Sequence, residues 1–161
     1  MIKQQKMKLE IKKYKFGERE SVTIPNPLFY KTIGEEEIRK MVSRHYELLR
    51  ISEIKHLFPT NNVDLELSKR NAADFMIQIC GGPDYFNQHR GNPMMAKRHA
   101  PFTITPEARI VWLDCYRIAL SEVTAPEELI ISFLELFKYF LQLDGKFGSI
   151  INFENTNTQN P

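Results

Sequence analysis

The feature that most constrains the fold is helical periodicity interrupted by proline and glycine. Between residues 27 and 143 no segment alternates apolar and polar residues as a half-buried strand would, and no internal repeat is present. The clearest period places six side chains on one helical face: Ile38, Met41, Val42, His45, Tyr46 and Leu49. The sequence therefore predicts an all-α core into which two polar rings, those of His45 and Tyr46, point.

Turn and cap signals divide this core into helices. A short helix from about 27 to 33 is expected to stop at Gly34, and a longer one from about 64 to 80 is ended by Gly81-Gly82-Pro83. The inward face of this longer helix is drawn through Ser68, Ala72, Phe75, Met76 and Ile79. Its first two turns carry small side chains, which leaves room for another group beside Ser68 and Ala72.

The second half of the core has boundaries of its own. Residues 83–93 are expected to form a loop, and residues 93–99 a short helix. Thr105-Pro106-Glu107 combines a capping side chain, a proline at the first position and an acid in the first turn, so a helix begins there. Thr124-Ala125-Pro126-Glu127 has capping-box spacing and opens the last helix.

Both ends of the chain are expected to lie outside this core. A length of 161 residues fits one domain, with residues 1–27 as an N-terminal extension and residues 144–161 as a C-terminal tail. Six lysines stand against one acid in the first 16 residues, a pattern most simply interpreted as a solvated extension. The stretch 152–161 is dense in Asn, Thr and Gln and is expected to be unstructured.

Charge and apolar content limit the partners and the location. A net charge of +2 does not indicate a nucleic-acid partner. No segment approaches the ~20 apolar residues of a membrane span, and no signal peptide is recognisable, so we expect a cytoplasmic protein. Cys80 and Cys115 form neither a CxxC pair nor a disulfide framework, which predicts reduced, buried thiols.

Few motifs of this chain carry chemistry by themselves. The nucleophile and phosphate-loop signatures are missing from the sequence, and the four histidines do not have the spacing of a zinc site. The unusual stretch is 86–102, in which His99 lies beside two cations and between apolar residues. That combination suits an anionic ligand with a large apolar body, but local chemistry alone also allows a histidine that caps a helix end.

Several short motifs, in this order and at this spacing, resemble group II truncated hemoglobins, the bacterial two-over-two globins. They are Phe29-Tyr30 with Gly34, Ser43-Arg44-His45-Tyr46, Gly81-Gly82-Pro83, Arg90-Gly91-x-Pro93, Arg98-His99-Ala100-Pro101-Phe102 and Trp112-Leu113-x-Cys115. The likeness covers about residues 28–143. It implies an all-α fold, the two-over-two helical sandwich, with heme b as cofactor.

The resemblance also implies which residues hold the heme. His99 corresponds to the proximal ligand, whose neutral imidazole nitrogen binds the iron and leaves one axial position open. Arg98, before Lys97 or Arg90, would pair with the heme propionates; the alternative for each of these cations is simple solvation. Met95 and Phe102 would pack against the porphyrin.

On the opposite, distal side, the resemblance places Tyr46, Ser68, Ala72 and Trp112 around the bound ligand. Tyr46 and Trp112 are hydrogen-bond donors; the alternative is that both are core aromatics with satisfied polar ends. Phe58 stands where many members have a second tyrosine, and Ala72 is smaller than the residue often found there. We expect His45 to be a packed or interface histidine rather than a second ligand.

Three hypotheses about function follow from this resemblance. The first is a heme protein that binds dioxygen and other diatomics, such as nitric oxide or carbon monoxide, with slow oxygen release that favours redox chemistry or sensing over oxygen transport. The second is a nitric oxide dioxygenase or peroxidase that needs an external reductase. The third, suggested only by the basic extension, is a heme-free interaction module.

Overall fold

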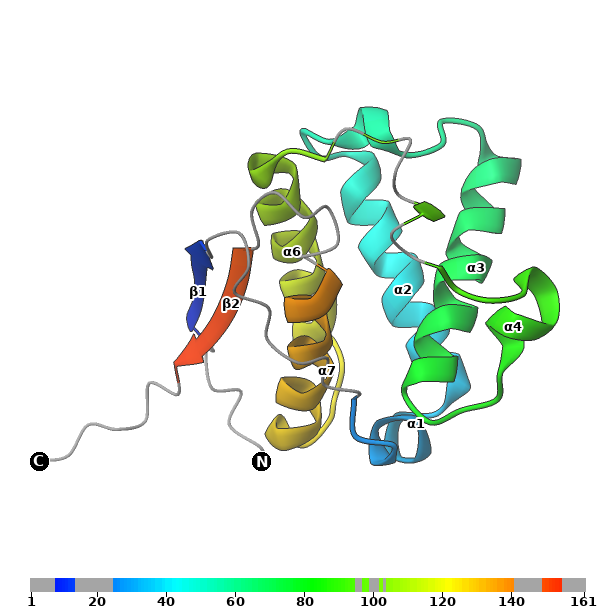
Figure 1. Cartoon of the computed structure of the whole chain (residues 1–161), viewed down its shortest axis with the longest axis vertical. Coiled ribbons are helices and arrows are strands. Elements are labelled where there is room, and N and C mark those ends of the chain that lie inside the picture. The colour runs from blue at the N-terminus through cyan, green and yellow to red at the C-terminus, as the bar shows by residue number, and fades with distance from the viewer. Residues whose placement is uncertain are drawn as a thin grey trace, which may run out of the picture.

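The computed structural model describes residues 8–13, 25–94, 97–98, 102, 104–140 and 149–154. Its helices are α1 (Leu28–Ile33), α2 (Glu35–Arg50), the 3-10 helix η1 (Lys55–Leu57), α3 (Asn62–Ile79), α4 (Tyr85–Arg90), α6 (Pro106–Ser121) and α7 (Glu127–Phe140), and its strands are β1 (Lys8–Lys13) and β2 (Ser149–Glu154) (Figure 1). Within these described ranges, none of the helices is long and apolar enough to cross a membrane.

Side-chain caps fix where the main helices begin. The Asn61 side chain accepts a hydrogen bond from the amide of Asp64, 2.8 Å away, at the start of α3. The Thr105 hydroxyl accepts one from the amide of Ala108 at 3.1 Å, and Pro106 occupies the first turn of α6. The start predicted for α6 is therefore confirmed.

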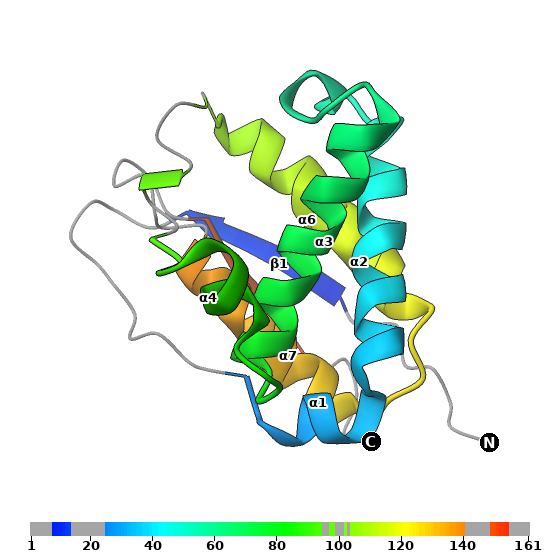
Figure 2. The same ribbon diagram turned by 90° about the vertical axis from the view of Figure 1, so that its right-hand side faces the viewer.

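The core lies where α2 packs against both α3 and α6: α2 stands between them in Figure 1, and in Figure 2 α3 lies in front of α6. The Phe29 ring of α1 stacks on the Phe133 ring of α7, with centroids 4.9 Å apart, and Tyr116 of α6 reaches the same Phe133 at 5.9 Å. The core side chains are buried; they include Ile38, Val42, Ala73, Ile77, Leu113, Leu120, Leu129 and Leu134. Cys80 and Cys115 are free and buried, as predicted, and burial raises the pKa of the Cys80 thiol to about 12.

Two local expectations are wrong. Residues 85–90 form the helix α4 rather than a loop; Gly91, with a φ of +74°, ends it, and the Gln78 side chain contacts Asn87 within it. The buried face of α3 is also rotated from the predicted one: of the five predicted residues only Met76 is buried, and Ser68, Ala72, Phe75 and Ile79 are half-buried. The buried side chains of α3 are Leu65, Lys69, Ala73, Asp74, Met76 and Ile77.

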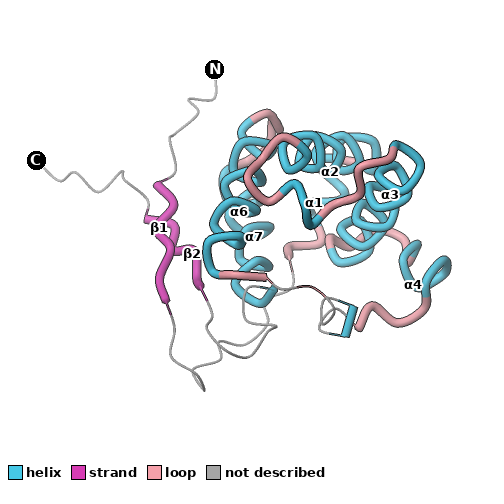
Figure 3. Tube along the Cα trace, turned by 90° about the horizontal axis from the view of Figure 1, so that it is seen from above, coloured by secondary structure: helices cyan, strands magenta, loops and turns pink. Residues whose placement is uncertain are grey.

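The two ends of the chain meet in a β-ribbon outside the helical core. β1 and β2 are antiparallel, with Ile11 opposite Ile151 and Leu9 opposite Phe153. The ribbon lies on the α7 side of the molecule, on the opposite side from α4, and β2 contacts α7 (Figure 3). The expectation of an unstructured tail is therefore wrong for residues 152–154, because each strand satisfies the other's backbone hydrogen bonds.

Candidate ligand-binding site

A cluster of aromatic rings joins the middle of α2 to α6. The imidazole of His45 lies 3.6 Å from the ring centroid of Tyr116 and meets the Trp112 indole edge-on at 4.9 Å. Tyr46, the next residue along α2, meets the Phe58 ring edge-on at 5.8 Å. The fold thus brings four residues expected near the ligand or beside it into one cluster: His45, Tyr46, Phe58 and Trp112.

His45 is buried and makes one polar contact within this cluster. Its Nε2 atom lies 3.0 Å from the backbone carbonyl oxygen of Trp112. Because a carbonyl oxygen only accepts, Nε2 carries the hydrogen and donates it. Burial lowers the pKa of His45 to about 3, against a smaller opposing effect of this hydrogen bond. The imidazole is therefore neutral at physiological pH, and His45 is packed, as expected.

Tyr46 is half-buried and keeps its proton. Burial raises the pKa of its phenol to about 12, and among the described residues none is hydrogen-bonded to the hydroxyl. A phenol in this state is a donor that lacks a protein acceptor in the described part of the chain. Such a group suits a bound ligand with a negative or polar end.

The α3 row predicted to face inward packs, in part, against the same main core as Tyr46 and Trp112. Ser68, Ala72, Phe75 and Ile79 follow one another at helical spacing and are all half-buried, and the last three pack against the main core. Protein atoms cover only part of each apolar side chain. Together with the half-buried rings of Tyr46, Phe58 and Trp112, this row fits one face of a flat, largely apolar group such as heme.

The residues expected on the proximal side are placed only in part. His99 and Met95 lie outside the described residues. Lys97 and Arg90 are exposed, and the apolar ring of Phe102 is 53% exposed. These positions leave the cations and the ring accessible to a bound group.

Arg98, next to His99, is held by the preceding loop. Its Nε donates to the carbonyl of Pro93 at 2.6 Å, and its Nη2 donates to the carbonyls of Arg90 and Asn92 at 3.0 and 3.3 Å. The guanidinium also lies 5.1 Å from the centre of the Phe86 ring. Arg98 therefore fastens the chain immediately before His99 to α4, a role that the sequence did not indicate.

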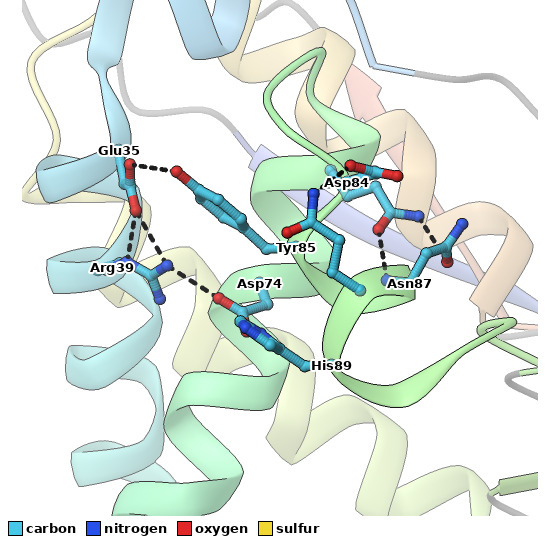
Figure 4. Close-up of polar contacts among 9 residues, drawn as sticks. Glu35, Arg39, Asp74, Asp84, Tyr85, Asn87 and His89 are labelled. Carbon is cyan, nitrogen blue, oxygen red and sulfur yellow. Dashed lines mark hydrogen bonds and ion pairs between the residues drawn. The ribbon is translucent and has the colours of Figure 1, made fainter.

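A second polar group that the sequence did not reveal lies between α2, α3 and α4 (Figure 4). The buried carboxylate of Asp74 accepts from Arg39 at 2.8 Å and contacts Nδ1 of His89 at 3.0 Å. Glu35 accepts from Arg39 at 3.0 Å and from the Tyr85 hydroxyl at 3.3 Å. This network ties α4, and through Arg98 the segment before His99, to the core helices.

The similarity to known proteins covers this whole helical region. The family described as bacterial-like globin matches residues 28–143. Group 2 truncated hemoglobin YjbI of Bacillus subtilis is 35% identical over 101 residues, which are 62% of this chain and 74% of that protein.

Solved structures agree in fold. Phosphate-bound Hell's gate globin IV is 39% identical with a TM-score of 0.72, and the match covers 75% of this chain and 76% of that one. The truncated oxygen-avid haemoglobin from Bacillus subtilis is 33% identical with a TM-score of 0.61, over 67% of this chain and 91% of that one. The predicted two-over-two helical sandwich is thereby confirmed. The chain belongs to the bacterial-like globin family, and within it to the group II truncated hemoglobins, whose cofactor is heme.

Proposed function

We propose that this chain holds heme through His99 and binds dioxygen, or another diatomic such as nitric oxide or carbon monoxide, on the side lined by Tyr46 and Trp112. Heme would supply an iron atom that can bind such a ligand. The observation that carries the proposal is the phenol of Tyr46, a protonated and half-buried donor with no acceptor among the described residues, beside the Trp112 cluster.

The two donors, Tyr46 and Trp112, would stabilise a bound ligand that carries negative charge. A hydrogen bond to a charged group contributes ~1.5–3 kcal/mol, and ~1.4 kcal/mol corresponds to a factor of ten. Tyr46 and Trp112 therefore each slow the release of dioxygen by about ten-fold or more. Phe58, which offers no hydroxyl, and the small Ala72 leave that part of the site apolar and roomy.

The test is the rate of oxygen release in stopped flow. Tyr46→Phe and Trp112→Phe are expected to speed release by about ten-fold each. Tyr30→Phe is the matched control, because it removes the same hydroxyl from a half-buried tyrosine on α1. Fast release by the unaltered protein, unchanged in Tyr46→Phe, would refute the proposal.

The role of His99 is tested separately by optical spectra of the oxidised, reduced and carbon monoxide-bound protein. His99→Ala is expected to lose or shift the Soret band. His56→Ala, at an exposed position in η1, is expected to keep it. A purified protein that stays colourless and gains no Soret absorbance with hemin would instead favour the heme-free interaction module.

Slow release suits consumption of the ligand better than its delivery. As the second candidate we therefore keep a redox activity on nitric oxide or peroxide, with electrons from an external reductase. The observation that favours it is the same pair of donors, which retains the ligand long enough to react. Turnover with a reductase, lost in His99→Ala and absent with free heme, distinguishes this activity from binding alone.

A further inference from the structure

One residue in the aromatic cluster has a polar contact that packing does not require. His45 is 1% exposed, yet its imidazole carries a hydrogen-bond donor that needs a partner once water is excluded. An apolar ring of the same size would stack on Tyr116 equally well. The donor has a specific acceptor instead, the backbone carbonyl of Trp112 at 3.0 Å.

His45 touches Trp112 in two ways. The hydrogen bond reaches its backbone, and the imidazole meets its indole at 90° with centroids 4.9 Å apart. A carbonyl oxygen can accept two hydrogen bonds. The Trp112 carbonyl can therefore accept the hydrogen bond from His45 and still take part in the backbone hydrogen bonding of α6. Both the main chain and the ring of Trp112 are thus held against α2.

The same turn of α2 also carries Tyr46. Because Tyr46 follows His45 directly, the link from His45 to Trp112 sets how far the phenol on α2 lies from the indole on α6. Hydrogen bonds weaken steeply when the donor is misaligned. A small shift of α6 along α2 therefore changes what the indole can donate to, even if both side chains remain.

We propose that His45 is a positioning residue that fixes Trp112 relative to Tyr46 by donating a hydrogen bond from Nε2 to the Trp112 carbonyl. The effect on ligand release rests on the proposed function, whereas the link between His45 and Trp112 does not. His45 acts through Trp112 and Tyr46 and does not itself touch the ligand.

The experiment compares His45→Phe, which keeps a ring but removes the donor, with His45→Gln, which keeps a donor. Trp112 is the only tryptophan, so its indole N–H gives a single signal in ¹⁵N-resolved NMR of the heme-loaded, carbon monoxide-bound protein. We expect His45→Phe to shift that signal and to speed oxygen release about three- to ten-fold. His45→Gln should lie closer to the unaltered protein in both measurements.

A second measurement needs no variant. The four histidines can be distinguished by their ring ¹⁵N shifts, and His45 should be a neutral Nε2–H tautomer. An Nδ1–H tautomer would overturn the proposal, whether or not His45→Phe folds. So would an unshifted indole signal and an unchanged release rate in His45→Phe, if Trp112→Phe does speed release.

Failure of the proposed function gives a different result. In that case Tyr46→Phe and Trp112→Phe release oxygen at the original rate, or the chain takes no heme. The indole signal and the histidine tautomer can still be recorded on the full-length chain. They then support the link between His45 and Trp112, or overturn it, independently of ligand binding.

Discussion

His45 and Tyr46 are consecutive residues of α2 with different tasks. His45 is buried and donates a hydrogen bond to the Trp112 carbonyl. Tyr46 is half-buried, and its hydroxyl has no acceptor among the described residues. Burial shifts both pKa values away from neutrality, that of His45 to about 3 and that of Tyr46 to about 12. Neither group changes charge near pH 7, so both side chains are neutral there.

The shifted pKa of His45 predicts a pH dependence of stability. The unfolded chain binds a proton below the ordinary pKa of 6.5, but the folded chain does not until about 3. The contribution of His45 to the free energy of unfolding is therefore largest above pH 6.5 and falls by about 1.4 kcal/mol per pH unit toward pH 4. The measurement is urea unfolding at pH 7, 6 and 5. The free energy of unfolding of His45→Phe should fall less steeply with decreasing pH than that of the unaltered protein. Equal slopes in the two proteins would contradict the prediction, since the other titrating groups are shared.

Gly81 predicts a steric effect on stability. Its φ is +95°, and a Cβ there would lie 2.9 Å from Cα and Cβ of Pro27. Gly91 is the matched control, because its φ is +74° and a Cβ would meet nothing within 4 Å. Both alanine variants carry the strain of a positive φ, ~1–3 kcal/mol. In denaturant unfolding, Gly81→Ala should lower the free energy of unfolding by roughly 1–3 kcal/mol more than Gly91→Ala. Equal losses would show that the backbone around Pro27 moves to accommodate the added Cβ at little cost.

At the scale of elements, α4 is the connection between the core and the segment that leads to His99. α4 is six residues long, too short to be stable alone. Its contacts with α3 are both apolar and polar: the buried Phe86 ring meets the Phe75 ring edge-on at 5.5 Å, Asp74 pairs with His89, and Gln78 contacts Asn87. The Arg98 guanidinium lies over the Phe86 ring. The position of the segment before His99 therefore depends on α3 through α4.

Asp74→Asn tests this connection. The substitution keeps the volume but removes the buried charge that binds Arg39 and His89, so we expect a loss of about 2–4 kcal/mol in urea unfolding. Asp114→Asn is the control, because that carboxylate is exposed and pairs with Arg117 on the surface of α6. It should cost less than about 1 kcal/mol. Similar losses for both variants would mean that the network does not hold α4.

Across the whole molecule, the β-ribbon lies outside the helical core. The buried core draws on α1, α2, α3, α6 and α7. β1 pairs with β2, and β2 contacts α7. The family match spans residues 28–143 and includes neither strand.

Removing residues 1–24 is therefore expected to leave heme binding and helix content unchanged. The deletion takes away β1 but keeps Pro25, which is buried, and Asn26, whose amide donates to the Ser132 hydroxyl at 2.6 Å. Soret absorbance and far-ultraviolet circular dichroism of the full and shortened chains provide the measurement. Loss of either signal would show that the extension is part of the globin domain and that the boundary at residue 27 is misplaced.

The sequence by itself determined the helices whose signals are local. Capping at Thr105 acts over three residues, and the periodicity of residues 38–49 fixes one face of α2, so both predictions hold. The family resemblance was also carried by short motifs read directly from the sequence. The roles of His99, Tyr46 and Trp112 come from that resemblance and stay predictions.

The tertiary structure alone decided which partners these elements meet. Lys69 and Asp74 are buried on α3 because Glu47 and Arg39 of α2 lie opposite them, although α2 is far away in sequence. The short helix α4 exists because α3 supplies contacts that its own sequence lacks. His45 donates to Trp112, 67 residues further along the chain. Burial and pairing depend on what lies across an interface, whereas caps and periodicity act within a few residues of one segment.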